Sequence, residues 1–207
     1  MAPTTGTPGN FPAIPWLLGD PRIRWVVMSS GPLEVREAVE SFLAERRYRV
    51  APFTVENADY LFDALWSEAR AAGDPAAIGR LRKAYLDHSD AMLAFFERIS
   101  RETFGREIAQ VLLIHANDLH AALLDDLLGR VEARGYRFVT LAEALEDPAY
   151  RTPDAYIGPH GPSWLHRWSL ALGLPMKLRE EPDPPSWVLE AFEALKTKAP
   201  AGPAALP

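Results

Sequence analysis

The sequence has no cysteine, no excess of positive charge and no long apolar run, and each absence narrows what the protein can be. Without cysteine, structural disulfides and thiolate-bound metal sites are excluded. A formal net charge of -6 argues against a nucleic-acid partner held by phosphate contacts. No stretch approaches the roughly 20 apolar residues that a membrane-spanning helix needs. We therefore expect neither a nucleic acid nor a membrane among the partners.

Several standard motifs are missing too. The chain has no glycine-rich phosphate loop, no Gly-x-Ser-x-Gly elbow and no His-Glu-x-x-His zinc motif. Its first residues carry neither the basic nor the apolar segment of a signal peptide, so we expect a cytoplasmic location. With 207 residues, the chain is long enough for one domain with a real core.

Short apolar runs alternate with helical patterns along the chain. The expected strands are 23–28, 48–55, 108–114 and 137–140. The helices between them carry one apolar face each, and the longest runs from Pro75 to about Phe104. This alternation predicts an α/β fold with a mainly parallel sheet. Because a closed α/β barrel has about eight strands, we expect these four to form only part of one.

His115 is the residue most strongly marked for chemistry, because it directly follows the apolar run 111–114. Sites in α/β folds form beyond the carboxyl ends of strands, and an imidazole there can exchange protons near neutral pH. The alternative is a loop histidine bonded to a backbone carbonyl. Asp59 follows the second expected strand, where its carboxylate could orient the imidazole and keep it available as an acid. Equally, Asp59 could serve only as a helix N-cap.

Two further histidines, His120 and His88, could have a functional or a structural role. His115, Asp118 and His120 could together bind a metal, but their spacing fits no metal motif with a mechanism behind it. We therefore assign no metal ligand in this chain. His88 lies beside the apolar stripe of the long helix, which favours a buried, hydrogen-bonded histidine.

The order of these features resembles the C-terminal part of a NodB-homology domain, the polysaccharide deacetylase family (carbohydrate esterase family 4). The resemblance extends from about Arg24 to Trp168. Its best anchors are the strings at 111–115, 134–139, 141–144 and 147–150. The segment 161–168 is similar to a C-terminal extension of some bacterial members.

The resemblance implies a distorted (β/α) barrel that hydrolyses an N-acetyl or similar amide on a sugar. In the family, one Asp and two His bind a divalent metal, often zinc, a second Asp activates water, and a late His protonates the leaving amine. His115 matches that late His. Asp59 matches a family Asp that tunes this His, and Tyr60 matches the aromatic residue that follows the Asp. We expect Tyr60 to contact substrate. Arg24 matches an Arg that opens a family motif, although the proline and second aromatic residue of that motif are missing here.

Under this resemblance, the fold class is a partial (β/α) barrel of the NodB type with a helical, aromatic-rich C-terminal extension. The expected segments are an irregular Pro/Gly-rich lead-in at 1–21, a partial deacetylase-like domain at 22–148, the extension at 149–197 packed on it, and a disordered tail at 198–207.

The departures from the family pattern decide the functional prediction. The metal-binding motifs Thr-Phe-Asp-Asp-Gly and His-Ser/Thr-x-x-His do not occur in the chain, so we expect no cofactor here and a zinc-type metal only in a complete homologue. A lone general acid supplies about 10²–10⁴-fold, too little to sustain amide hydrolysis. We predict a truncated, deacetylase-like hydrolase acting on carbon–nitrogen bonds of carbohydrates that is inactive alone. The alternative is a non-catalytic binding module, and the expected partners are a carbohydrate, an upstream half-domain or a second copy at an open sheet edge.

Overall fold

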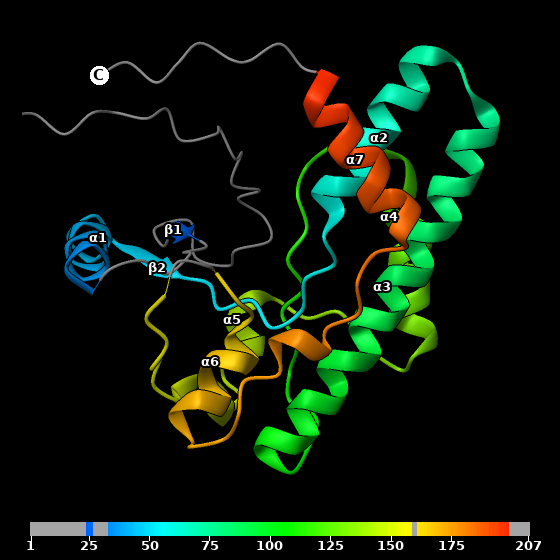
Figure 1. Cartoon of the computed structure of the whole chain (residues 1–207). Helices are drawn as coiled ribbons and strands as arrows, with labels where there is room; N and C mark the ends of the chain where they lie inside the picture. The colour runs from blue at the N-terminus through cyan, green and yellow to red at the C-terminus, as the bar shows by residue number, and fades with distance from the viewer. Residues whose placement is uncertain (1–23, 27–32, 159–160, 199–207) are drawn as a thin grey trace, which may run out of the picture. The chain divides into compact units, whose positions relative to one another are not determined.

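The computed structural model describes residues 24–26, 33–158 and 161–198 (Figure 1). Within these ranges the chain forms seven α-helices and two short strands. It divides into two compact units, each assembled from separate stretches of sequence. The first comprises the described parts of 1–54, 100–111 and 138–176, and the second those of 55–99, 112–137 and 177–207. The predicted lead-in at 1–21 and nearly all of the predicted tail lie outside the described residues.

The predicted partial (β/α) barrel is wrong, because the described chain is an all-α protein. Its only strands there, β1 (Arg24–Val26) and β2 (Tyr48–Val50), have three residues each and pair in parallel. One isolated parallel bridge joins Val55 to Leu112, and residues 137–140 form no strand. A short apolar run fits a strand locally, but a strand also needs a neighbour in register to satisfy its backbone N–H and C=O groups. Sequence periodicity does not show whether that neighbour exists.

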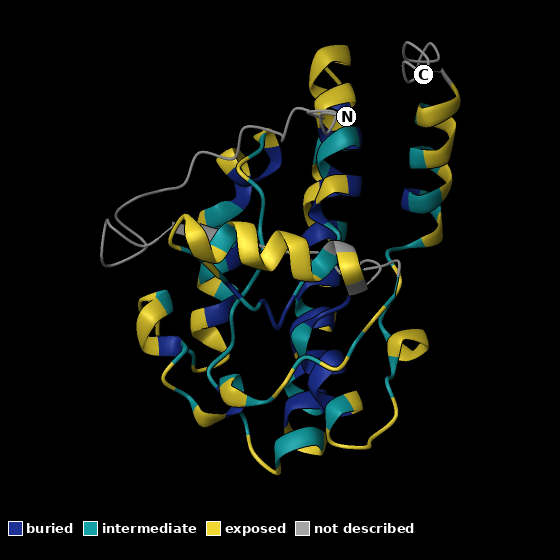
Figure 2. Ribbon diagram, turned by 90° about the vertical axis from the view of Figure 1, so that its left-hand side faces the viewer, coloured by how far each residue is buried: buried dark blue, intermediate teal, exposed yellow. Residues whose placement is uncertain are grey.

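The first unit contains β1, β2, α1 (Leu33–Glu45), α5 (Leu141–Ala144) and α6 (Trp164–Ala171). We expected one buried apolar face on each helix, but in α1 the apolar residues Val39 and Phe42 are exposed, as is most of this helix (Figure 2). The core of the unit is built instead around fully buried Trp168. Edge-on contacts with Phe104 and Tyr150, at ring-centroid distances of 5.9 and 5.1 Å, hold its indole. The apolar helix-spaced residues near the end of the sequence thus pack as predicted for α6.

The second unit contains α2 (Asp59–Ala72), α3 (Pro75–Phe104, up to residue 99), α4 (Asp118–Ala133) and α7 (Ser186–Lys198). Local signals in the sequence set the junction between α2 and α3. Gly73 ends α2 in the left-handed conformation, with φ 63°, which glycine adopts without a Cβ penalty. The Asp74 carboxylate then accepts hydrogen bonds from the backbone N–H groups of Ala76 and Ala77, both at 3.0 Å, and caps α3.

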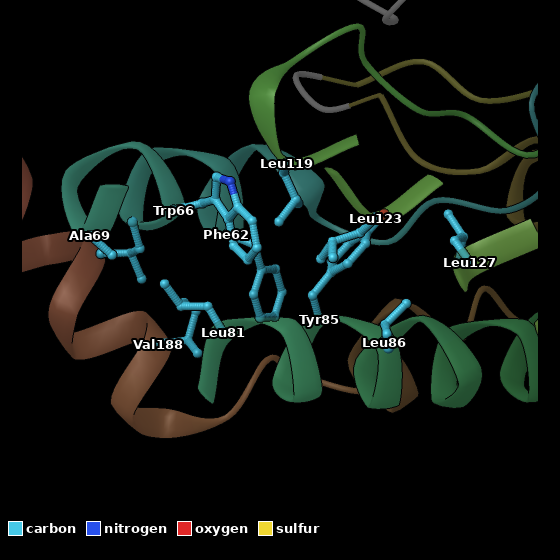
Figure 3. Packing of buried hydrophobic residues seen from close by; sticks show 11 residues of the cluster. Phe62, Trp66, Ala69, Leu81, Tyr85, Leu86, Leu119, Leu123, Leu127 and Val188 are labelled. Carbon is cyan, nitrogen blue, oxygen red and sulfur yellow. The ribbon is translucent and has the colours of Figure 1, made fainter. Parts of the chain in front are cut away.

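The core of the second unit lies where α2 packs against α4 and α7. Its members are apolar residues at helical spacing, as the sequence predicted for α3 and α4. The cluster comprises Phe62, Leu65, Trp66, Ala69, Leu81, Tyr85, Leu86, Leu119, Leu123, Leu127 and Val188 (Figure 3). Burial of a leucine of this kind contributes about 1.5–3 kcal/mol. This core positions the residues of the site described below.

The described helices also bear on the membrane question. None of those within the described ranges is both long enough and apolar enough to cross a membrane.

Truncation of a core leucine should measure this packing. We expect Leu123→Ala to lower the free energy of unfolding by about 2–5 kcal/mol, because it removes buried methyl groups and leaves a cavity. Leu170→Ala, at an exposed position of α6, is the control and should change it by less than about 0.5 kcal/mol. Urea unfolding followed by far-ultraviolet circular dichroism measures both, and equal losses would contradict the assigned core.

Candidate functional site

Two segments distant in sequence run side by side and bring Asp59 and His115 together. The backbone N–H of Leu113 donates to the carbonyl of Val55 at 2.8 Å, next to the parallel bridge between Val55 and Leu112. Because the two segments run in the same direction, the residues that follow them emerge on the same side. Asp59 follows one segment and His115 the other. Both residues therefore lie beyond the carboxyl ends of neighbouring parallel segments, as the sequence predicted, although the described chain has no extended sheet.

The Asp59 carboxylate binds His115 at two points. Its Oδ1 lies 2.7 Å from the ring Nδ1, and its Oδ2 accepts the backbone N–H of His115 at 2.8 Å. A carboxylate only accepts hydrogen bonds, so Nδ1 carries the proton of this contact. The side chain of Asp59 is 3% exposed and that of His115 is 38% exposed. A buried carboxylate thus orients an imidazole that reaches solvent.

Asp59 is not the N-cap of α2, which corrects the alternative interpretation of that residue. The N-cap is Ala58, whose side chain makes no capping bond and whose φ of 51° is left-handed. This conformation costs a residue with a Cβ roughly 1–2 kcal/mol. Asp59 is instead the first helical residue, where the positive end of the helix dipole stabilises its negative charge.

A second histidine holds the backbone of His115. Nδ1 of His120 lies 2.7 Å from the His115 carbonyl oxygen, which can only accept, so this Nδ1 carries a proton. Nε2 of His120 then accepts from the Tyr85 hydroxyl at 2.6 Å, and the Tyr85 oxygen accepts from the Asn57 amide at 2.8 Å. Asn57 also donates to Ser89 at 3.3 Å. His115 is therefore fixed through its N–H, its carbonyl and its ring.

Tyr85 and Asn57 are site residues that the sequence did not reveal. Burial and then the nearby charge of Asp59 raise the pKa of the Tyr85 hydroxyl, which keeps it protonated and able to donate. In the sequence, Tyr85 was visible only as a member of the apolar stripe of α3. A tyrosine hydroxyl on a buried helix face needs a hydrogen-bond partner. This requirement is the one feature of the sequence that could have indicated a polar role for Tyr85.

The metal interpretation of His115, Asp118 and His120 does not fit the structure. Both ring nitrogens of His120 are engaged in the contacts above, and Asp118 pairs with Arg70 at 3.2 Å. In the part of the chain that the structure describes, no three His, Asp or Glu side chains are grouped so that they could hold a metal ion. The described residues therefore do not fit the metal site of the deacetylase family.

The remaining predicted site residues lie elsewhere. Tyr60 is next to Asp59 in sequence, but it is 58% exposed and its ring contacts Phe192 edge-on with 6.0 Å between the centroids. Arg24 lies in β1 opposite Tyr48, in the other unit, and its side chain is outside the described set.

His88 is buried, as predicted, but its Nε2 has no hydrogen-bond partner among the described residues. Its imidazole packs against the ring of Phe62 with 5.7 Å between the ring centroids. Burial lowers the pKa of His88 to about 4, against the opposing charge of Asp183.

Comparisons with family models, with curated proteins and with solved structures find no match to this chain. The geometry of the site therefore carries the functional argument together with the sequence resemblance.

Removal of the Tyr85 hydroxyl should destabilise the network. Tyr85→Phe leaves the Nε2 acceptor of His120 and one amide donor of Asn57 unsatisfied in a buried place. We expect the free energy of unfolding to fall by about 1–3 kcal/mol. Tyr60→Phe is the matched control, because that ring is exposed, and it should have an effect below about 0.5 kcal/mol in the same urea titration.

Acid should destabilise the protein through His88. The folded-state pKa of about 4 lies below the ordinary value of 6.5, so between these pH values the unfolded chain binds the proton more tightly. The neutral, buried His88 therefore contributes fully to the free energy of unfolding above pH 6.5. As the pH falls to about 4, this contribution is lost, and the free energy of unfolding falls by up to about 3 kcal/mol. Urea unfolding across this range should show that His88→Leu flattens the loss, and an unchanged slope would contradict the assignment.

Proposed function

We propose that this chain is a polysaccharide deacetylase-like protein in which Asp59 and His115 form the proton-donating dyad of a site for N-acylated sugars. We further propose that the chain does not hydrolyse such amides by itself. One observation carries the proposal, namely the 2.7 Å contact between the buried Asp59 carboxylate and the partly exposed His115 imidazole. The sequence resemblance pairs the same two residues.

The dyad is suited to protonate a leaving amine. With Nδ1 of His115 held by Asp59, the ring offers Nε2 for proton transfer. In its protonated form, Nε2 would give its proton to the nitrogen of the tetrahedral intermediate as the carbon–nitrogen bond breaks. This leaves a neutral imidazole, a free amino sugar and the acyl group as its carboxylic acid. The Asp59 carboxylate would stabilise the positive ring before the transfer and fix its orientation throughout.

The proposed inactivity of the isolated chain follows from the small rate acceleration that a general acid supplies alone. General-acid catalysis contributes about 10²–10⁴-fold, whereas enzymes accelerate their reactions by about 10⁶-fold or more. The chain has no counterpart of the family's opening motifs, so the groups that activate water would come from a partner chain. The proposal includes such a partner, with this chain supplying the acid.

A non-catalytic binding module is the second candidate. It is favoured by the second oxygen of Asp59, which accepts the backbone N–H of His115, and by His120, which holds the His115 carbonyl. These contacts order a loop whether or not a proton is ever transferred.

A titration with triacetylchitotriose tests the proposal on the full chain. We expect the His115 ring signals in a ¹⁵N-histidine nuclear magnetic resonance spectrum to shift with saturable dependence on sugar. Signals of buried His166, which belongs to the other unit, serve as a reference within the same spectrum for effects not centred on the dyad. Acetate release should stay at the blank level with and without added zinc.

The variant Asp59→Asn separates the two candidates. A proton-donating site predicts that Asp59→Asn alters the pH dependence of the His115 ring signals while the sugar still perturbs them. Perturbation of His115 by sugar with an unaltered pH profile in Asp59→Asn would favour the binding module. No shift of His115 at millimolar sugar would refute a sugar site at the dyad, and zinc-dependent acetate release would refute inactivity of the chain.

A further inference from the structure

Helix α1 of the first unit presents an apolar side to solvent (Figure 2). Phe42 is 52% exposed and Val39 is 39% exposed, and Ala38 beside them is exposed as well. These three residues lie within about 100° of one another around the helix, because one residue turns it by about 100°. We call them the apolar side of α1. Exposed apolar residues that lie together indicate an interaction surface, whereas scattered single ones do not.

A different side of α1 holds the helix to its unit. The Arg36 guanidinium lies 3.2 Å from the Asp154 carboxylate and donates to the carbonyl oxygen of Tyr156, also at 3.2 Å. Leu43 is half-buried. Arg36 and Leu43 lie about 100–120° around the helix from Phe42. Packing within the unit therefore leaves the apolar side of α1 uncovered.

The apolar side of α1 combines a hollow with a projection. Glu34, Ala38, Val39 and Phe42 line a hollow of about 430 Å³. Ala38 contributes only a methyl group, whereas Phe42, one turn further along, carries a large ring. In a dimer with two-fold symmetry, both copies use the same surface, so that surface has to fit itself. A small residue and a large one on the same side of a helix meet this requirement.

The charges beside the hollow also suit a second copy. Glu34 lies one turn before Ala38, and Arg46 lies one turn after Phe42. Among the described residues, Glu34 has no ion-pair partner. The Arg46 guanidinium lies over one face of the Phe42 ring, 3.6 Å from its centroid, and 3.3 Å from the carboxylate of exposed Glu45. An exposed pair of this kind is weak, so Arg46 can exchange it for another carboxylate.

One antiparallel register of two α1 helices satisfies the shape and the charges together. When Phe42 of one copy lies against Ala38 of the other, Arg46 of the first lies opposite Glu34 of the second. Both matches follow from the same spacing, because Arg46 is four residues after Phe42 and Glu34 is four residues before Ala38. The two-fold axis repeats each contact. A parallel pairing would instead place Glu34 against Glu34 and Arg46 against Arg46.

We propose that the apolar side of α1 is a self-association surface for a second copy of this chain. The two α1 helices pair antiparallel, with Phe42 of each copy in the hollow at Ala38 of the other and Arg46 paired with Glu34 across the interface. A helix of 13 residues is about 20 Å long, so the interface is small and the dimer is weak and reversible. The inference uses neither the dyad nor the proposed reaction.

Sedimentation equilibrium of the full chain, at concentrations from about 10 μM to about 1 mM, tests the surface. We expect a monomer–dimer equilibrium in this range. Phe42→Ala should raise the dimer dissociation constant at least about tenfold, because it removes the ring that fills the hollow. Phe138→Ala is the matched control, since Phe138 belongs to the same unit and is also 52% exposed. It should change the constant less than about twofold.

Charge reversal tests the antiparallel register. Glu34→Arg and Arg46→Glu each place like charges opposite one another and should each raise the dissociation constant at least about fivefold. The double variant restores opposite charges and should return the constant to within about twofold of the original. Glu37→Arg is the control, because exposed Glu37 lies about 140° around the helix from Phe42. A double variant as weak as the single ones would overturn the register.

Two results would overturn the surface itself. A chain that stays monomeric at about 1 mM excludes a second copy and leaves the apolar side of α1 to a different protein. A dimer whose dissociation constant is unchanged in Phe42→Ala and Glu34→Arg uses another surface. Neither result affects the proposed function, because the sugar titration reports on His115 in the other unit.

Discussion

The bond between the Asp59 carboxylate and His115 is the constraint on which the rest of the site depends. One buried carboxylate satisfies two donors of a residue 56 positions further along the chain, one on the backbone and one on the ring. An unpaired donor or an unpaired carboxylate at this site would lower the free energy of unfolding. The contact therefore holds the two segments in register. The same contact leaves the imidazole accessible to solvent. One interaction therefore holds the two segments together and orients the exposed imidazole.

The network behind the dyad shows how a helical core accommodates polar groups. Tyr85, Asn57 and Ser89 bond to one another, and the chain of bonds ends at His120 and the His115 carbonyl. A protonated Tyr85 hydroxyl is required, because His120 offers it only an acceptor. Burial supplies this requirement by raising the pKa of the hydroxyl. A polar chain of this kind specifies one arrangement of α2, α3 and α4, whereas apolar contacts alone are less directional.

Phe62 packs against one residue of the polar network and against one histidine outside it. Its ring contacts Tyr85 at a centroid distance of 5.4 Å and His88 at 5.7 Å. His88, which contacts Phe62, and His120, which contacts Tyr85 edge-on, have different surroundings. His120 has a partner for each nitrogen, whereas Nε2 of His88 has none among the described residues. Burial lowers the pKa of His88 to about 4, although the nearby charge of Asp183 opposes the shift.

The sequence by itself determined the junction between α2 and α3 and the buried faces of α3 and α4. Gly73 and Asp74 act through local backbone conformation, and Leu119 or Leu123 through helical periodicity, so neighbouring residues contain the information needed. The pairing of Asp59 with His115 was expected from the family resemblance. The tertiary structure alone decided that the apolar runs do not assemble into a sheet, because strand pairing depends on partners far away in sequence. It also decided that Tyr85 donates a hydrogen bond within a buried network, because hydrogen-bond partners on other helices leave no local pattern in the sequence. Likewise, only the packing of the helices decided that Tyr60 is exposed.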